Sequence, residues 1–246
     1  MKFIHLADVH ASKERYPLVS KALGSVIERC KKNDISAVII AGDFWDNTVT
    51  VSDSSHFNDY VSIIKELASY TVVVFIYGTP LHENNGSLKP FELIDNVTVI
   101  SSYFPETTYI ITSDGSFILL SLPEPRLSLV SGENLEKKYE KIQAEFDNFA
   151  SIVEQQDFEE LPVICAVHNE IAGCKYQNGT VIPSGKATIS INLLKRLHAD
   201  YYACGHIHEP QKLGHGLNGG YCGSLVPINF GETHSARFTE IEINKE

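Results

Sequence analysis

Carboxylate and imidazole side chains occur at several separate points of this 246-residue chain, each just after a hydrophobic run typical of a β-strand. They form five short motifs: Asp8-Val9-His10, Gly42-Asp43, residues 78–83, His168, and Gly205-His206-Ile207-His208. Because the carboxyl ends of parallel strands meet at one edge of a sheet, we expect these side chains to lie close together. Carboxylates and imidazoles bind divalent cations, and paired cations are typical of phosphoester hydrolysis. The sequence therefore predicts a site for two metal ions and metal-assisted phosphoester hydrolysis.

The first two motifs are weak evidence when each is taken alone. Asp8 and His10 are two residues apart, so on an extended strand end both side chains project to the same side. Gly42 permits a tight turn before Asp43, whose two carboxylate oxygens could bridge two cations. A surface pair and a helix-capping aspartate are the ordinary alternatives.

The histidines near the carboxyl-terminal half carry more information. His168 ends a buried strand, where it could equally be a core residue whose ring bonds a backbone carbonyl. His206 and His208, two residues apart after another buried strand, could reach two adjacent ions from one edge. This pair is the strongest single element of the pattern.

Alternating strands and helices are expected to position these motifs. Strands are predicted over residues 2–7, 36–41, 71–77, 109–112, 117–121, 162–167 and 200–204, and helices over residues 16–32, 53–70, 132–158 and 191–198. Turn signals at residues 113–116 predict an antiparallel hairpin. The pattern predicts an α/β protein, with helices outside a two-sheet β-sandwich rather than a single open sheet. No linker or repeat is evident, so residues 1–246 are predicted to form a single domain.

Composition limits the partners. The net charge of −11 argues against general affinity for nucleic acid, so contacts to phosphates must be local or supplied by a partner. Local candidates are Lys13, Arg15, Lys175 and Lys186. No stretch approaches the roughly 18–20 apolar residues of a membrane span, and the start of the chain has no signal-peptide pattern, so a cytoplasmic location without membrane contact is expected.

The order of the motifs resembles the calcineurin-like metallophosphoesterase superfamily, whose motifs run Asp-x-His, Gly-Asp-x-x-Asp, Gly-Asn-His-Asp/Glu, His and Gly-His-x-His. Four of the five are intact, and the resemblance covers residues 3 to about 230. It implies that sandwich fold, and it implies that His82 assists catalysis while Asp46 lies beside the ligands. The implied ligands of the first ion are Asp8, His10, Asp43 and His208, and those of the second are Asp43, His168 and His206.

The third motif departs from the family pattern. Gly78-Thr79-Pro80-Leu81-His82-Glu83 lacks the asparagine that normally completes the second metal site. The hydroxyl of Thr79, a backbone carbonyl, a water molecule or the side chain of Asn84 could replace it, and the sequence does not choose among them. A neutral hydroxyl is a poorer ligand than a fixed amide carbonyl, so a weaker second site is expected.

Within the superfamily, the chain most resembles the DNA double-strand-break repair nucleases of the SbcD and meiotic-recombination-eleven type. The stretches that carry this resemblance are residues 3–10, 41–46, 202–210, 221–225 and 230–232. It implies a DNA backbone substrate, two manganese ions, an SMC-like ATPase partner of the SbcC type and a possible homodimer. His82 would then donate a proton to the leaving oxygen.

Two other functions stay open. Family nucleases continue into a DNA-binding cap, whereas this chain ends at Glu246, so DNA contacts would come from a dimer or partner, or the substrate is a small phosphodiester or phosphomonoester. A long open groove lined by Lys13, Arg15 and Lys186 would favour DNA as the substrate. A narrow, closed groove would favour the small substrate. The altered third motif also permits a non-catalytic scaffold, as the retromer subunit that resembles this superfamily illustrates.

Overall fold

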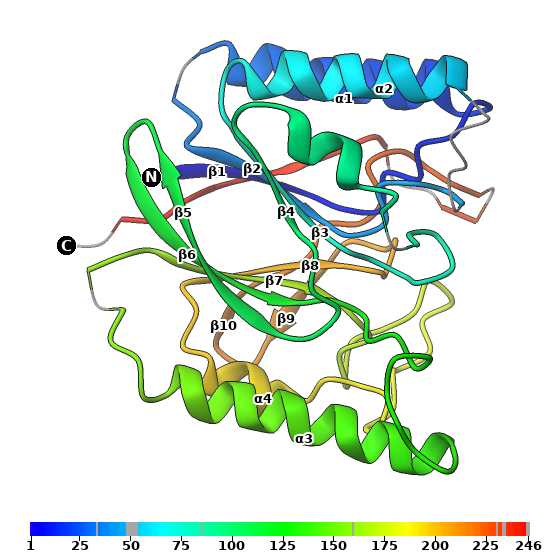
Figure 1. Ribbon diagram of the computed structural model, residues 1–246, viewed down its shortest axis with the longest axis vertical. Helices are drawn as coiled ribbons and strands as arrows, with labels where there is room; N and C mark the ends of the chain where they lie inside the picture. Colours follow the sequence, from blue (N-terminus) through cyan, green and yellow to red (C-terminus); the bar gives the residue numbers. More distant parts are fainter. Residues whose placement is uncertain are drawn as a thin grey trace.

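Two β-sheets pack face to face, and helices cover the outer face of each (Figure 1). The computed structural model describes residues 1–32, 34–47, 54–84, 86–158, 160–229, 231–232 and 235–244, apart from the side chains of residues 54 and 55. This arrangement confirms the predicted α/β sandwich.

The first sheet is parallel except at one edge. Its strands follow the order β11-β1-β2-β3-β4, and β11 pairs antiparallel with β1. The bounds are β1 (Lys2–Leu6), β2 (Ala37–Ala41), β3 (Val72–Ile76), β4 (Val97–Ile100) and β11 (Thr239–Glu242).

The second sheet has a parallel centre between two antiparallel edges. Its order is β5-β6-β7-β8-β10-β9. The bounds are β5 (Glu106–Thr112), β6 (Gly115–Leu122), β7 (Val163–His168), β8 (Tyr201–Gly205), β9 (Gln211–Gly214) and β10 (Leu217–Tyr221). The antiparallel β5–β6 pair confirms the predicted hairpin.

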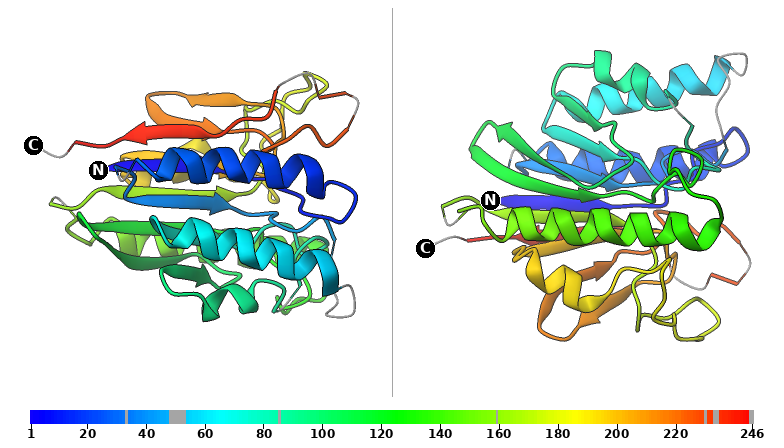
Figure 2. Two further views of the ribbon diagram at one scale, coloured as in Figure 1. Left: turned by 90° about the horizontal axis from the view of Figure 1, so that it is seen from above. Right: turned by 60° about the horizontal axis from the view of Figure 1, so that its bottom comes forward.

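Helices α1 (Tyr16–Cys30) and α2 (Ser54–Ala68) cover the first sheet, and α3 (Leu135–Val153) and α4 (Ile191–Arg196) cover the second (Figure 2). A short 3-10 helix, η1 (Lys89–Leu93), precedes β4. Each predicted helix is found and ends earlier than predicted, and residue 53 of the second lies outside the described residues. In α1 the buried face includes Val19, Leu23 and Val26, whereas Leu18 is 59% exposed. The apolar face that α1 packs against the sheet therefore runs along Val19, Leu23 and Val26.

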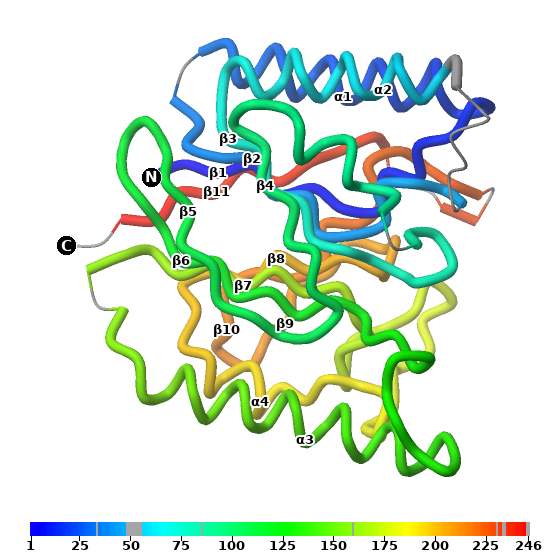
Figure 3. The backbone as a smooth tube through the Cα atoms, in the orientation of Figure 1, coloured from blue at the N-terminus to red at the C-terminus, as the bar shows by residue number. Residues whose placement is uncertain are grey.

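Three apolar layers hold the sandwich together. One lies between α1, α2 and the first sheet, one between the two sheets, and one between the second sheet and α3 with α4. Figure 3 traces the backbone of the elements that enclose these layers. The strands β2 and β7 are buried along their whole length, because each is covered on both faces. Among the described residues, no helix combines the length and apolar composition that a membrane crossing requires.

Candidate metal centre

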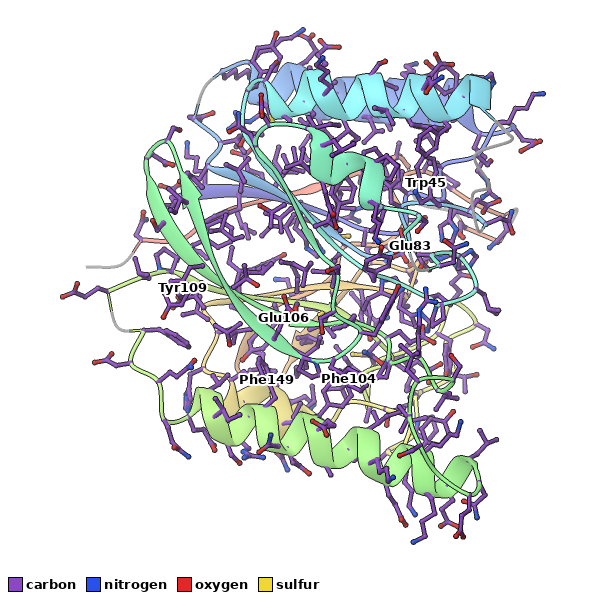
Figure 4. All side chains as sticks on the ribbon, viewed as in Figure 1. Trp45, Glu83, Phe104, Glu106, Tyr109 and Phe149 are labelled. Atoms are coloured by element: carbon purple, nitrogen blue, oxygen red, sulfur yellow. The ribbon has the colours of Figure 1, made fainter. Side chains whose placement is uncertain are left out.

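Five strand ends, drawn from both sheets, carry the predicted motifs. The loops after β1, β2 and β3 leave the first sheet, and those after β7 and β8 leave the second. Figure 4 shows Glu83 and Trp45, which belong to two of these loops, at the opposite end of the molecule from Tyr109 on β5. The sequence motifs were expected at one edge of a parallel sheet; instead, they meet where two sheets converge. A hydrogen bond from Nδ1 of His168 to the carbonyl of Ala41, 2.8 Å long, joins the two sheets there.

The backbone of the site is strained. Asp8, His10, Asp43 and His206 have φ angles of 49°, 46°, 50° and 94°, in the left-handed region that non-glycine residues rarely adopt. Each such residue costs about 1–3 kcal/mol and persists only where its surroundings hold it. Asp8 N donates to Gly42 O and His10 N to Asp43 O, both over 3.1 Å, so the loops after β1 and β2 support each other. The strained turns aim the side chains at a common point.

Asp8, His10 and His208 form a first group, whose potential ligand atoms lie within 4.8 Å of one another. Nε2 of His10 and Nε2 of His208 are 3.2 Å apart. Nδ1 of His10 faces Oδ1 of Asp46 at 3.2 Å, and Nδ1 of His208 faces Oε1 of Glu232 at 3.0 Å. The facing carboxylates favour a proton on each Nδ1, so the two Nε2 atoms present lone pairs to each other. A cation between them resolves this repulsion, and these residues therefore fit a metal ion.

Asp8 is held by the loop of the second sheet. Its side chain is fully buried, and both carboxylate oxygens accept a hydrogen bond from the backbone N–H of His206, at 3.0 and 3.1 Å. Burial raises the pKa of Asp8, while the charges of His168 and His208 act in the opposite direction. The carboxylate is thus fixed in place before any ion binds.

Asp43 lies between His10 of the first group and His168. Its Oδ2 is 4.0 Å from Nε2 of His10 and 3.3 Å from Nε2 of His168. Burial opposes its charge, yet the His168 imidazole holds the pKa of Asp43 well below its usual range. In return, and against the effect of burial, Asp43 raises the pKa of His168 to about 10. One carboxylate therefore faces ligands on both sides, as a bridging position requires.

Thr79 lies where the family's asparagine would be expected. Its Oγ1 is 3.0 Å from Oδ2 of Asp43, 3.3 Å from Nε2 of His168 and 3.5 Å from Nδ1 of His206. Asn84, in contrast, uses its backbone carbonyl to accept hydrogen bonds from Ser87. Its side chain forms no hydrogen bond with the described ligand residues.

Glu124 completes a second group with His168 and His206, and it was not among the residues predicted from the sequence. Oε2 of Glu124 lies 3.7 Å from Nδ1 of His206. Burial raises the pKa of this carboxyl group, against the opposing effect of the His168 charge. Its position just after β6 was a usable signal, because the other motifs also follow strands.

His82 and Glu83 support the site from the loop after β3. Nδ1 of His82 donates to the backbone carbonyl of Asp46, and its ring lies edge-on to His10 with centroids 4.7 Å apart. Glu83 is buried and accepts hydrogen bonds from the N–H groups of Phe44 and Gly78, at 2.8 and 2.7 Å. Burial and the nearby Asp43 carboxylate raise the pKa of Glu83 to about 7. This side chain ties the loops after β2 and β3 together.

A pocket of about 470 Å³ opens beside the second-sheet histidines. Its lining consists of Tyr176, Gln177, Asn178, His206, Ile207, His208 and Asn229. Two of the four basic residues singled out from the sequence form ion pairs: Arg15 donates to Asp46, and Lys186 pairs with Glu136 and Glu140 of α3, each at 2.9 Å. The pocket wall is therefore polar and largely uncharged.

Comparison with known proteins shows which family and which relatives the chain resembles. Residues 1–210 match the family model of the calcineurin-like phosphoesterases. The SbcD component of the SbcCD nuclease of Escherichia coli, from strain K12 and from O157:H7, is 24% identical over 267 residues. Those alignments cover 98% of this chain and 64% of each relative, so the chain spans less than two thirds of their length.

Two solved structures share the fold. One is GAP50, the anchor in the inner membrane complex of Plasmodium, with a TM-score of 0.56 and 16% identity over 91% of this chain and 71% of that one. The other is the phosphopantetheinyl hydrolase PptH of Mycobacterium tuberculosis, with a TM-score of 0.50 and 11% identity over 91% and 89%. At these identities the likeness concerns the fold alone. Because the family model spans most of the sequence, the chain belongs to the calcineurin-like phosphoesterase family.

Proposed function

We propose that this phosphoesterase is a DNA nuclease that hydrolyses backbone phosphodiesters with two manganese ions. The observation that carries the proposal is the position of the buried Asp43 carboxylate between histidines of the two ligand groups, with Oδ2 4.0 Å from Nε2 of His10 and 3.3 Å from Nε2 of His168. DNA as substrate and manganese as the ion are supported by the resemblance to SbcD, which extends over nearly the whole chain at 24% identity.

In this proposal the two ions share Asp43, as the family resemblance implies. Asp8, His10, Asp43 and His208 would hold the first ion, and Asp43, His168 and His206 would hold the second. The structure brings Asp8, His10 and His208 together as one group, and Asp8, Asp43 and His168 as another. Bound divalent cations supply Lewis acidity toward a phosphate group and make an attacking water more acidic. The strained, hydrogen-bonded loops keep the ligand side chains fixed, so little reorganisation accompanies binding.

In the proposed reaction, His82 exchanges a proton with the leaving oxygen. Because Nδ1 donates to the carbonyl of Asp46, Nε2 is the atom left to exchange a proton with the leaving oxygen. The contact with the ring of His10 keeps this imidazole beside the first group. Asp46 is not a ligand in this proposal. Its carbonyl accepts the hydrogen bond from His82, and its carboxylate faces Nδ1 of His10.

The proposal also covers partners, location and domain organisation. The sequence and its resemblance to SbcD predict a partner ATPase of the SbcC type, a homodimer, a cytoplasmic location and a single domain over residues 1–246. These four points stay predictions.

A small phosphodiester or a phosphomonoester is the second candidate substrate. The polar, largely uncharged pocket beside His206 and His208 favours it, as do the ion pairs that engage Lys186. A DNA groove would be expected to offer free cationic side chains to the phosphates.

The first test compares substrates under identical conditions. Manganese-loaded wild type, His206→Ala and the control His215→Asn, an exposed histidine in the β9–β10 turn, are assayed on end-labelled single- and double-stranded DNA and on a bis-aryl phosphodiester. Cleavage of DNA by wild type and control, lost in His206→Ala, is the expected result. Turnover of the small diester alone would replace DNA with the second candidate, and turnover of neither would favour a scaffold.

A further inference from the structure

The second metal site lacks the family asparagine, and the structure offers a specific replacement. We propose that Glu124 is a ligand of the second metal ion and supplies the oxygen that the third motif has lost. This inference rests on the proposed two-ion site.

The carboxylate of Glu124 faces the two histidines of the second group. Its ligand oxygen and the ligand nitrogens of His168 and His206 lie within 4.8 Å of one another. The 3.7 Å separation of Oε2 from Nδ1 of His206 is too long for a hydrogen bond. Oε2 is buried and has no hydrogen-bond partner among the described residues. A buried carboxylate oxygen without a partner is costly, and a cation shared with the imidazoles would satisfy it.

Strand pairing explains how this segment reaches the site. β6 pairs parallel with β7, with Leu122 opposite Val167, so the residues after β6 lie beside the end of β7 at His168. Nδ2 of Asn169 donates to the carbonyl of Pro123 over 2.9 Å and fastens the segment there. Glu124 is therefore a strand-end residue like the other ligands.

The segment is also held rigid. Pro123 and Pro125 flank Glu124 and restrict the backbone around it. Arg126 donates to the carbonyl of Glu83 and lies over the ring of Tyr103, 4.1 Å from its centroid. Because the backbone on both sides of Glu124 is held, little backbone entropy is lost when its carboxylate binds an ion.

Thr79 alone is a weak substitute for the asparagine. Its hydroxyl donates to Oδ2 of Asp43, and an uncharged hydroxyl stabilises a divalent cation less than a carboxylate does. Glu124 adds a negative charge to the same group. With this residue the second site gains a charged ligand, so the weaker affinity expected from the third motif is offset.

The experiment measures metal binding directly. Wild type, Glu124→Gln and Glu106→Gln are stripped with chelator, and Mn²⁺ binding is followed by equilibrium dialysis and calorimetry. Glu106 is a matched control, a half-buried glutamate on β5 away from Glu83 in Figure 4. Wild type and control should bind two ions per chain. Glu124→Gln should keep the first ion and bind the second at least about 10-fold more weakly, since loss of a residue that merely supports a ligand already lowers metal affinity by about 10- to 100-fold.

Direct ligation is separated from a general charge effect by spectroscopy and rescue. The visible spectrum of the Co²⁺-loaded protein should change in Glu124→Gln and not in Glu106→Gln. Adding Thr79→Asn to Glu124→Gln restores the family asparagine and should restore the second ion. A double variant that still binds one ion would contradict the idea that Glu124 replaces that asparagine.

The outcomes separate this inference from the proposed function. Unchanged affinity for both ions in Glu124→Gln, with an unchanged Co²⁺ spectrum, overturns the role of Glu124 while leaving the two-ion site intact. Wild type that binds one ion or none overturns the two-ion site itself. Thermal unfolding of the metal-free variants checks that each one is folded.

Discussion

Glu232 fixes the ring of His208: its Oε1 lies 3.0 Å from Nδ1, so the imidazole turns Nε2 toward Nε2 of His10. The carboxylate is itself held by hydrogen bonds from the hydroxyl of Ser224 and the N–H of Ile228, both 2.8 Å long. Glu232 comes from one of the stretches that resemble SbcD, whose first residue, Phe230, lies outside the described residues. A carboxylate that orients a ligating histidine also makes it a stronger base toward a metal.

Glu232→Gln should selectively weaken the binding of the first ion. Loss of the charge behind His208 is expected to lower affinity for the tighter Mn²⁺ by about 10- to 100-fold. Calorimetric titration of the stripped protein measures this, with Glu106→Gln as the control. An affinity equal to that of wild type would show that His208 is positioned by other contacts.

His82→Ala should separate catalysis from metal binding. Because Nε2 of His82 is proposed to exchange a proton and not to bind an ion, kcat should fall by about 10²- to 10⁴-fold while two ions remain bound. Steady-state assays and metal analysis of the same sample test both parts. Loss of an ion from His82→Ala would instead make His82 a ligand, since it lies close to His10 and Asp43.

Gly78→Ala should disable the site through the backbone. A Cβ at this position would overlap the backbone nitrogen and the carboxylate of Asp43, so the bridging side chain must move. A displacement of this kind is expected to lower kcat/KM by about 100-fold or more. Gly24→Ala in α1 is the control, because its added Cβ meets no atom within 4 Å. That control should raise stability by up to about 1 kcal/mol, and an active Gly78→Ala would mean that the loop adapts.

His5 should make the fold sensitive to acid. Burial lowers the pKa of His5 to about 3, and its ring stays neutral in the folded protein. The unfolded chain binds a proton near the ordinary pKa of about 6.5, so stability is full above that value and declines as the pH falls toward 3. At pH 5 the expected loss is about 2 kcal/mol relative to pH 8.

The variant His5→Gln isolates this contribution. Its free energy of unfolding in the presence of chelator should fall less between pH 8 and pH 5 than that of wild type, by about 2 kcal/mol. The exposed His215→Asn serves as the control and should follow wild type. Parallel curves for His5→Gln and wild type would show that another group governs the acid sensitivity.

The sequence by itself determined the order and type of most helices and strands, and it singled out the candidate metal ligands. Hydrophobic periodicity placed the strands and helices because burial repeats every two residues in a strand and about every 3.6 in a helix. Asp8, Asp43 and His206 could be singled out because each follows a strand, a relationship that is local in the chain. The start of α3 differs from the prediction: this helix begins at Leu135 rather than near residue 132, with Asn134 capping it.

Only the tertiary structure decided how the two sheets converge and which further residues join them. The bond from His168 to Ala41, the contact of Glu232 with His208 and the position of Glu124 beside His206 all join residues distant in sequence. These contacts depend on strand order and on the packing of one sheet against the other, for which no local pattern exists. The sequence therefore showed that an asparagine was missing, and the fold showed that the carboxylate of Glu124 lies near His168 and His206.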